Sequence, residues 1–413
     1  MSATSDDLTN GRDEGIIEPE NGRPTADSRL FHSITLRNIL SFSPENEPLE
    51  LKNLNVLIGP NGSGKSNLLE AIHLLRSTPD DIRPVLSRGG GVREWIWKGQ
   101  PDQAASIVAI VKNPAGKQPI GHTFSFRSEN QVFRIILEEV DRGRLVRGGS
   151  SSVYRFGGSR PTIGRVKGQG IQALKGRFDP DLSILSQRNE PETYPEISNL
   201  KDAYSRIRLY REWSIGRNSI FREPQRADLR TDRLEEDFSN LGLFLNKLRQ
   251  KPKAKQALLA QLSNLYDGLS DFDVSIEGGT VQVFFTEGDF TIPAPRLSDG
   301  SLRYLCLLAI LCDPNPPPLI GIEEPELGLH PDLLPNLADL FVEASQRCQL
   351  IVTTHSDMLV DALTQQPESI VVCEKHEGGT SMRRLDAKEL APWLEKYHLG
   401  DLWIRGQLGG TRW

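Results

Sequence analysis

Runs of apolar residues at two different spacings divide this chain into strands and helices. Residues 31–42 contain an alternating pattern that predicts a strand, and Leu54 to Ile58 form a short apolar strand that ends at Gly59. The next apolar side chains, between 68 and 75, recur every three or four positions, which predicts a helix over 67–75. The chain therefore begins its folded part with a strand, a glycine-rich loop and a helix.

Two further groups of elements follow. Three β-rich segments predict an antiparallel meander beside the first unit, and a second group of strands and helices predicts a parallel sheet with crossover helices. The meander segments are 105–111, 122–127 and 131–138. The later elements are strands 272–276 and 280–285, a helix from Ser298 to Leu311, strand 318–322, helix 332–345, strand 349–354 and strand 369–374.

The stretch between these two groups has a different character. Residues 142–234 hold 19 Lys and Arg against 10 Asp and Glu, an excess of nine positive charges, and residues 234–268 have helical spacing. No heptad pattern continues over several turns, so no long coiled-coil arm is expected. We predict five parts: a disordered leader at 1–29, a core split between 30–140 and 270–380, an inserted arginine-rich, mainly helical subdomain at 141–269, and a tail at 381–413.

Composition adds limits rather than a function. The whole chain of 413 residues has a net charge of −6, so contact with nucleic acid would need a local basic patch. The four cysteines form no CxxC pair and lie in or beside apolar runs, as expected for buried thiols in a reducing compartment. Residues 1–29 lack the apolar segment of a signal peptide, and no run reaches a membrane span, so we expect a cytoplasmic protein without membrane contact.

The glycine-rich loop carries the clearest chemistry. Its sequence is Gly59-Pro60-Asn61-Gly62-Ser63-Gly64-Lys65-Ser66-Asn67. Glycines allow successive backbone N–H groups to point at phosphate oxygens, the lysine adds a positive charge near the β- and γ-phosphates, and the serine offers a hydroxyl to Mg²⁺. We predict a nucleotide triphosphate site here, with ATP and Mg²⁺ as ligands.

Three more motifs fall where a nucleotide would need them. Strand 318–322 ends in Glu323-Glu324, and we assign Glu323 to Mg²⁺ and Glu324 to the attacking water. The turn Ser298-Asp299-Gly300 begins a helix, where free N–H groups attract anions, although in isolation it is an ordinary helix cap. His355 ends strand 349–354 at the same sheet edge, although a lone strand-end histidine is more often structural.

These four motifs, in this order, resemble the ABC ATPase class, and in detail its SMC, RecF and OLD-type branch. The resemblance covers about 31–140 and 270–380. It rests on Ile34-Thr-Leu-Arg-Asn-Ile-Leu-Ser-Phe42, the loop above, Glu-Glu-Pro-Glu followed by Leu329-His330-Pro331, and Thr353-Thr354-His355-Ser356. The ends Leu399-Gly400-Asp401-Leu402-Trp403 and Gly409-Gly410-Thr411-Arg412-Trp413 look like those of bacterial ATPases with such a head. The implied fold is an α/β P-loop head with a mixed, mainly parallel sheet and an antiparallel meander.

The resemblance also implies how the site works. Two heads would sandwich two ATP molecules, giving a homodimer or a higher even oligomer, and Ser298 to Gly300 of one chain would contact the γ-phosphate held by Lys65 of the other. His355 would sense that phosphate, with Glu324 and Lys65 as its catalytic partners, and Arg37 would lie near the nucleotide. A Mg²⁺-contacting glutamine should link the head to the insertion; Gln187 is the first choice, with Gln100 and Gln103 as alternatives.

This sequence departs from the pattern of the family at two positions, and it is compatible with three functions. Glu323 stands where the pattern usually has Asp, and Asp299 interrupts the usual double glycine, so hydrolysis is expected to be slow or partner-dependent. OLD nucleases carry a C-terminal Toprim domain, which we do not find in this sequence. The first hypothesis is an ATPase for DNA repair or antiviral defence that acts with a separately encoded effector such as a nuclease. The alternatives are the nucleotide-binding subunit of a membrane transporter and a nucleotide-gated scaffold with little turnover.

Overall fold

A six-stranded sheet forms the centre of the fold, and five of its strands run parallel. The computed structural model describes residues 27–114, 116, 118–143, 152–164, 171–213, 216, 219–265 and 268–410. The strand order is β10-β15-β16-β3-β17-β18, and only the β17–β18 pair is antiparallel. The strands are β3 (Leu54–Ile58), β10 (Arg208–Tyr210), β15 (Leu319–Glu323), β16 (Gln349–Thr353), β17 (Ile370–His376) and β18 (Gly379–Arg384). The carboxyl ends of the five parallel strands therefore meet at one edge.

Residues on this sheet alternate between two hydrophobic cores, as the period of a β-strand requires. In β3, Val56 and Ile58 face the core that contains the later helices, whereas Leu57 faces the core that contains the first helix. That helix is α1 (Lys65–Ser77), and its buried face includes Leu68 and Ile72. The glycine-rich loop is thus held between a fully buried strand and a helix whose apolar face is buried.

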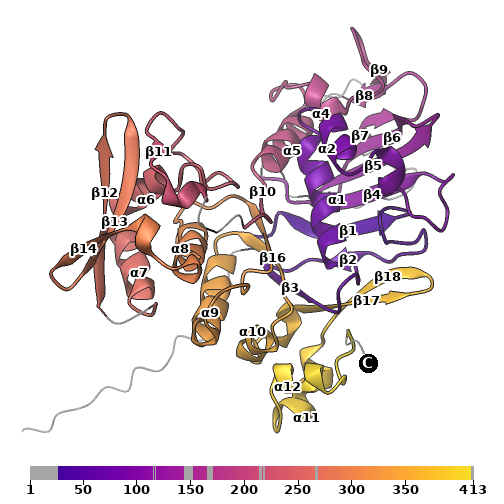
Figure 1. Ribbon diagram of the computed structural model, residues 1–413. Coiled ribbons are helices and arrows are strands. Elements are labelled where there is room, and N and C mark those ends of the chain that lie inside the picture. Colours follow the sequence, from indigo (N-terminus) through magenta and orange to yellow (C-terminus); the bar gives the residue numbers. More distant parts are fainter. Residues whose placement is uncertain are drawn as a thin grey trace, which may run out of the picture.

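A second, antiparallel sheet covers the other side of α1 (Figure 1). Its order is β2-β1-β4-β5-β6-β7-β8-β9. The strands are β1 (Phe31–Arg37), β2 (Leu49–Glu50), β4 (Ala105–Val111), β5 (Ile120–Glu129), β6 (Val132–Arg142), β7 (Ser152–Phe156), β8 (Thr162–Gly164) and β9 (Ile171–Ala173). Short helices flank it: α2 (Arg83–Arg88), α3 (Val92–Trp95), α4 (Ile184–Gln187) and α5 (Pro195–Ser205).

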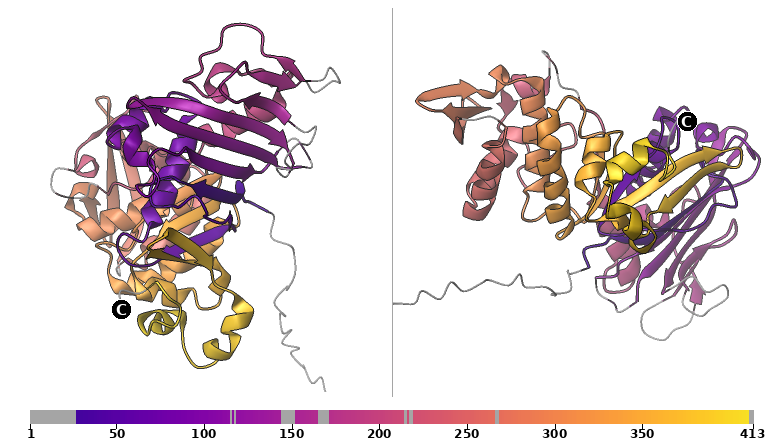
Figure 2. Two further views of the ribbon diagram at one scale, coloured as in Figure 1. Left: turned by 90° about the vertical axis from the view of Figure 1, so that its right-hand side faces the viewer. Right: turned by 90° about the horizontal axis from the view of Figure 1, so that it is seen from below.

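A third sheet lies in a separate lobe, away from the antiparallel one, and Figure 2 shows the two at opposite ends of the molecule. It consists of β11 (Gln225–Arg226), β12 (Leu269–Glu277), β13 (Thr280–Glu287) and β14 (Phe290–Pro293). It packs against α6 (Leu241–Arg249) and α7 (Pro252–Leu262), and these two helices pack against α8 (Asp299–Leu311). The remaining helices are α9 (Leu334–Ser345), α10 (Asp357–Ala362), α11 (Ala387–Leu394) and α12 (Leu399–Ile404), with 3₁₀ turns at Ile220–Arg222, Ala294–Arg296, Pro331–Leu333 and Pro367–Ser369.

The fold class expected from the sequence is confirmed, since the meander, the phosphate-loop unit and the later parallel strands all form. The sequence predicts residues 141–269 as a separate, mainly helical insertion. In the structure, this segment instead extends two of the sheets. It adds β7 to β9 to the antiparallel sheet and β10 to the central sheet, because these short strands bury apolar side chains against existing edges.

The limits set by composition can be compared with the structure in part. All four cysteines are free and buried, and burial raises the pKa of Cys312, Cys348 and Cys373 to about 12. No helix in the described ranges is both long and apolar enough to cross a membrane. Residues 1–26 of the expected leader and residues 411–413 of the C-terminal motif lie outside the described residues.

Candidate nucleotide-binding site

The glycine-rich loop joins β3 to α1 in a conformation that suits bound phosphate. Gly59, Gly62 and Gly64 have φ values of 146°, 78° and 100°. A Cβ at Gly59 would lie 2.2 Å from the Cys373 carbonyl oxygen, so only glycine fits that close approach. Helix α1 begins at Lys65 with no side-chain cap and no acidic residue in its first turn. Its amide donors and the positive end of its dipole are therefore available to an anion.

Lys65 is folded onto the loop itself. Its Nζ donates to the carbonyl oxygens of Gly59, at 2.7 Å, and Pro60, at 3.1 Å. The residue is 5% exposed, and burial lowers the pKa of its amino group. These backbone partners are neutral, so they do not cancel the positive charge of the lysine, which can act on an anion held by the loop.

The loop is braced by hydroxyl groups from two distant segments. Thr380 Oγ1, on β18, donates to the Ser63 carbonyl oxygen at 2.9 Å and lies 2.7 Å from Ser41 Oγ. Asn67 Nδ2 also donates to Ser41 Oγ, at 2.7 Å. Beside this bracing lies a cavity of about 420 Å³ whose walls include Phe42, Leu68 and Thr380. An apolar hollow next to the phosphate loop suits a flat, uncharged ring such as a nucleotide base.

The two carboxylates predicted at the end of β15 lie at the same edge as the loop. Ser66 Oγ donates to Glu323 Oε1, which brings together two of the three groups assigned to Mg²⁺. The described residues hold no cluster of three His, Cys, Asp or Glu side chains that could hold a metal by itself. One hydroxyl and one carboxylate nevertheless fit Mg²⁺, which takes few protein ligands and fills its other positions with water and substrate phosphate.

Glu324 has the backbone strain expected at a functional position. Its φ is 45°, in the left-handed region that L-residues seldom adopt, and its N–H donates to the Thr353 carbonyl oxygen at 3.0 Å. Its carboxylate Oε1 lies 3.5 Å from His355 Nε2. The structure therefore brings the predicted catalytic carboxylate and the predicted strand-end histidine together.

The acidic motif also supports that histidine from behind. Glu326 Oε1 accepts from Thr354 Oγ1 and from the His355 N–H, each at 2.7 Å. Burial raises the pKa of the Glu326 carboxyl, although these two hydrogen bonds oppose the shift. Glu326 thus fixes the backbone at His355.

An arginine that the sequence reading missed holds the Mg²⁺-assigned carboxylate. Arg211 follows β10, and its Nε donates to Glu323 Oε2 at 3.0 Å while its Nη1 lies 2.9 Å from Glu70 Oε1. Burial works against ionisation of Glu70, but bonds from His73 and Arg211 lower its pKa to about 2. Arg211 therefore neutralises Glu323, and a divalent cation would have to share or displace that contact.

A second set of contacts connects Glu323 and Glu324 to helix α8. Trp213 Nε1 donates to the Glu323 carbonyl oxygen at 2.7 Å. The Arg303 guanidinium lies 4.6 Å from the centre of the Trp213 ring, and its Nη2 donates to the Glu324 carbonyl oxygen at 3.3 Å. In the sequence this segment is Ile207-Arg208-Leu209-Tyr210 followed by Arg211-Glu212-Trp213, and three apolar residues interrupted by an arginine are too weak a pattern to predict a strand.

The predicted signature turn lies on the surface of the other lobe. Ser298 caps α8 by accepting from the Ser301 N–H at 3.1 Å, and the exposed Asp299 forms an ion pair with Arg222. A Cβ at Gly300 would lie 2.6 Å from the Gly328 carbonyl oxygen, so the turn touches the segment that follows the carboxylates. No polar contact in the described part of the chain joins this turn to residues 59–67.

Four other predicted residues are not brought to the loop by any observed contact. Gln187 Nε2 donates to the carbonyl oxygens of Asp179 and Leu182, and its Oε1 accepts from the Asp179 N–H, so its amide closes a local turn. Gln100 and Gln103 accept from Asn38 through their backbone carbonyls. Arg37 is exposed at the end of β1. The contacts to Glu323 from this part of the chain come from Arg211 and Trp213 rather than from these glutamines.

This fold and this set of side chains define a P-loop ATPase head of the ABC type. The chain belongs to the family described as "AAA domain, putative AbiEii toxin, Type IV TA system", whose model matches residues 54–361. Among curated proteins it is 25% identical over 332 residues to the OLD nuclease of Thermus scotoductus, covering 77% of this chain and 57% of that protein. It is 23% identical over 251 residues to the chromosome partition protein Smc of Mycoplasma genitalium, covering 58% of this chain and 24% of that protein. It therefore spans a quarter to somewhat over half of these relatives.

Solved structures agree on the fold. The head domain of Smc bound to the C-terminal winged-helix domain of ScpA superposes with a TM-score of 0.58 at 14% identity, covering 87% of this chain and 99% of that one. The Pyrococcus furiosus Smc head with an extended coiled coil gives 0.55 at 13% identity, covering 89% of this chain and 99% of that one. The expected SMC- and OLD-type relationship is confirmed. The longest helices in the described residues, α1 and α8, have 13 residues each, so no coiled-coil arm is present there.

Proposed function

We propose that this chain binds ATP with Mg²⁺ and hydrolyses it, and that ATP joins two copies of the chain. The observation that carries the proposal is the division of the site. The loop, Glu323, Glu324 and His355 meet at one sheet edge, whereas the exposed signature turn lies in the other lobe (Figure 1). A second copy would supply the missing turn, since one copy does not bring its own turn to its own loop.

Each residue has a task in this scheme. Lys65 and the amides of the loop bind the phosphates, and Ser66 with Glu323 would hold Mg²⁺, which when bound neutralises charge on the phosphate oxygens. Glu324 accepts the proton of the attacking water, and His355 beside it senses the terminal phosphate. Because Arg211 pairs with Glu323 and Arg222 pairs with Asp299, both must adjust before turnover. Slow hydrolysis fits this arrangement.

The test is the oligomeric state with and without nucleotide. Light scattering after size exclusion should give the mass of one chain without nucleotide and twice that mass with Mg²⁺ and ATP, with ADP unable to replace ATP. A parallel assay of phosphate release should show slow turnover that rises with protein concentration, because the active form is a dimer. A constant mass in all three conditions, together with turnover independent of concentration, would remove the shared-site proposal.

We further propose that the ATPase acts in the cytoplasm on DNA, in repair or antiviral defence, with an effector encoded separately. The family and the relatives named above, which include a toxin system, a nuclease and a chromosome partition protein, support this proposal. The arginine-rich segment supplies the charge. Exposed cations at Arg160, Lys175 and Arg177 follow the outer strands of the antiparallel sheet.

Duplex DNA should therefore bind with an affinity that depends strongly on salt. The logarithm of the binding constant should fall with the logarithm of salt concentration by about 0.9 for each phosphate contacted. Fluorescence anisotropy with a labelled duplex should show weaker binding and a shallower slope after Arg160→Glu, Lys175→Glu and Arg177→Glu are combined. Lys388→Glu, on the surface of α11, is the matched control. No binding at low salt, with or without ATP, would remove the DNA part of the proposal.

A further inference from the structure

A cavity at the opposite end of the central sheet from the phosphate loop has a composition that the ATPase site does not explain. Its volume is about 280 Å³. It lies where β10 begins, next to Pro316 and Pro317, which precede the parallel strand β15. The amino ends of these strands face this cavity, whereas their carboxyl ends face the nucleotide site. The two sites are therefore separate.

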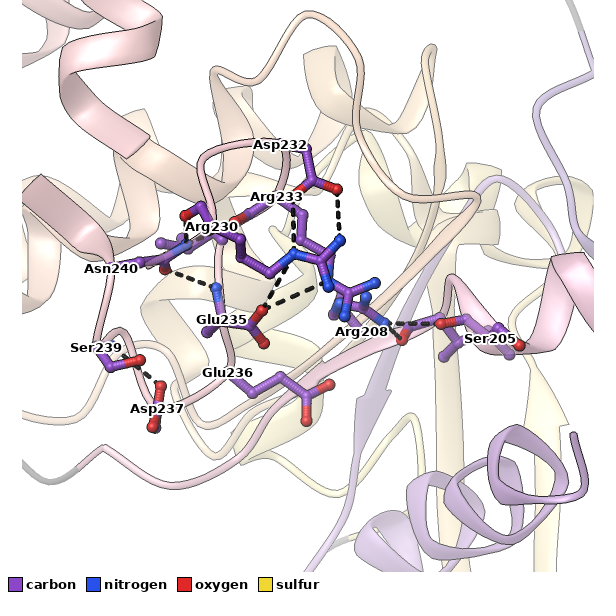
Figure 3. Close-up of polar contacts among 12 residues, drawn as sticks. Ser205, Arg208, Arg230, Asp232, Arg233, Glu235, Glu236, Asp237, Ser239 and Asn240 are labelled. Carbon is purple, nitrogen blue, oxygen red and sulfur yellow. Dashed lines mark hydrogen bonds and ion pairs between the residues drawn. The ribbon is translucent and has the colours of Figure 1, made fainter. Parts of the chain in front are cut away.

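Three arginines line the cavity: Arg206, Arg208 and Arg233. The first two lie just before β10 and at its first residue, and the third comes from the loop before α6. The acidic residues in its lining are Asp232 and Asp313, and much of the remaining wall is apolar, including Tyr210, Phe244 and Ile310. Figure 3 shows the Arg208 and Arg233 side chains close to each other on the two facing segments.

Arg208 is the unusual member of this group, because it is only 6% exposed. Its Nη1 donates to two backbone carbonyl oxygens, those of Ser205 at 3.0 Å and Ile207 at 2.6 Å. In the described part of the chain it forms no ion pair. Burial lowers the pKa of Arg208, and the positive charges of Arg233 and Arg76 lower it further against the opposing effect of Glu236. A buried cation without an anionic partner is costly, so this position is incomplete without an anion.

Of the acidic side chains near the cavity, Asp232 and Glu236 pair with other arginines, whereas Asp313 has only a neutral backbone partner. Asp232 accepts two hydrogen bonds from Arg230, each 2.7 Å long, and Asp313 accepts from the Asn315 N–H at 3.0 Å. Glu236 forms an ion pair with Arg76 and accepts from the Leu209 N–H at 2.6 Å. The other two arginines form longer ion pairs. Arg206 lies 3.5 Å from Asp202, and Arg233 lies 3.5 Å from Glu235. The lining holds three arginines against two aspartates, so it keeps an excess of positive charge, while Asp313 has no cationic partner among the described residues.

The loop that carries Arg233 is fixed in place before any ligand arrives. Asn240 is fully buried, and its Nδ2 donates to the carbonyl oxygens of Arg230, at 2.8 Å, and Arg233, at 2.7 Å. Its Oδ1 accepts from the Glu235 N–H at 2.9 Å, as Figure 3 shows. The buried amide thus spans the loop, and a preorganised loop loses little entropy when it binds a ligand.

We propose that this cavity binds the phosphate group of a small phosphorylated molecule, with Arg208 at its base and Arg206 and Arg233 at its rim. Guanidinium groups recognise tetrahedral oxyanions through paired N–H donors, which is why arginine suits such sites. The apolar part of the wall leaves room for an uncharged body attached to the phosphate. This proposal does not depend on ATP hydrolysis by the chain.

The test uses the full chain carrying Lys65→Ala, which removes phosphate binding at the loop. Isothermal titration calorimetry with inorganic phosphate and, separately, with a nucleoside monophosphate should show saturable binding of one molecule per chain. Arg233→Ala and Arg206→Ala should each weaken it by about tenfold or more, because each removes a charge-assisted contact. Arg226→Ala is the matched control, an exposed arginine paired with Asp228 outside the cavity.

The two ligands distinguish the source of the phosphate, and binding of either one supports the site. Tighter binding of the nucleoside monophosphate than of inorganic phosphate shows that the nucleoside contacts the apolar wall of the cavity. Arg208→Met should abolish binding; if that variant does not fold, as thermal unfolding will show, the two rim variants carry the test. No saturable binding at millimolar ligand overturns the proposal, as does equal binding by the rim variants. Binding of duplex DNA to this chain without any binding of small phosphates also overturns the proposal.

Discussion

Replacing Lys65 by alanine is expected to abolish measurable ATP binding. The lysine is buried within the loop, where its two present partners are the neutral carbonyl oxygens of Gly59 and Pro60. With ATP bound, the same amino group would contact phosphate oxygens in a partly desolvated site, where charge-assisted hydrogen bonds are strongest. Loss of two such contacts at about 1.5–3 kcal/mol each weakens binding by about two to four orders of magnitude.

Calorimetric titration of ATP in the presence of Mg²⁺ measures this directly. Lys388→Ala is the control for removing a lysine, because that residue is exposed on α11, far along the chain from the loop. Thermal unfolding should show that both variants remain folded. Tight ATP binding by the Lys65→Ala chain would contradict the assignment of this loop as the phosphate site, and with it the proposed ATPase.

The loop could be predicted from the sequence because all its determinants are local. Glycines at three positions with positive φ, the buried strand before them and the helix after them lie within 24 residues, from Leu54 to Ser77. Glu323, Glu324 and His355 were also accessible, since strands that run parallel bring their carboxyl ends together whatever their separation in the chain. The sequence pattern therefore identifies the residues that meet at this edge of the sheet.

The supporting residues could not be found in this way, because they depend on strand order. Strand β10 has only three residues and lies within the arginine-rich segment, so its pairing with β15 has no signal of its own. That pairing alone places Arg211 against Glu323 and Trp213 against the Glu323 carbonyl oxygen. Gln187 was chosen for its place in the sequence, but its amide is satisfied by a local turn instead.

The departures in the motifs have a structural counterpart. Asp299, where the resemblance leads one to expect glycine, forms an ion pair with Arg222, and Arg222 Nη1 also donates to the Leu297 carbonyl oxygen at 3.0 Å. This arginine therefore holds the signature turn within the single chain. On the other side, Arg303 links the same helix to Trp213 and to the Glu324 backbone. A change in the Glu324 backbone would thus act through Arg303 on helix α8, which begins at the turn that would contact the partner's nucleotide.

Changing Glu324 to glutamine is expected to stop hydrolysis while leaving ATP binding intact. Glutamine keeps the size of the side chain but cannot accept the proton of the attacking water, so turnover should fall by about 10²- to 10⁴-fold. The strained backbone at φ 45° is unchanged by this substitution, and the Thr353 contact made through the backbone N–H persists. ATP would then remain between two chains, and the ATP-bound dimer should persist for far longer than that of the unmodified chain.

Phosphate release measures the expected loss of turnover, and the decay of the dimer after dilution measures its expected longer lifetime. Glu343→Gln, an exposed carboxylate on α9 that pairs with Arg347, is the matched control and should leave both unchanged. Glu323→Gln should differ from Glu324→Gln by raising the Mg²⁺ requirement, since it removes the carboxylate that Ser66 contacts. If the Glu324→Gln dimer decays as fast as the unmodified one while both release little phosphate, hydrolysis does not set the lifetime of the complex. The chain would then act as a nucleotide-gated scaffold, because binding alone would control its assembly.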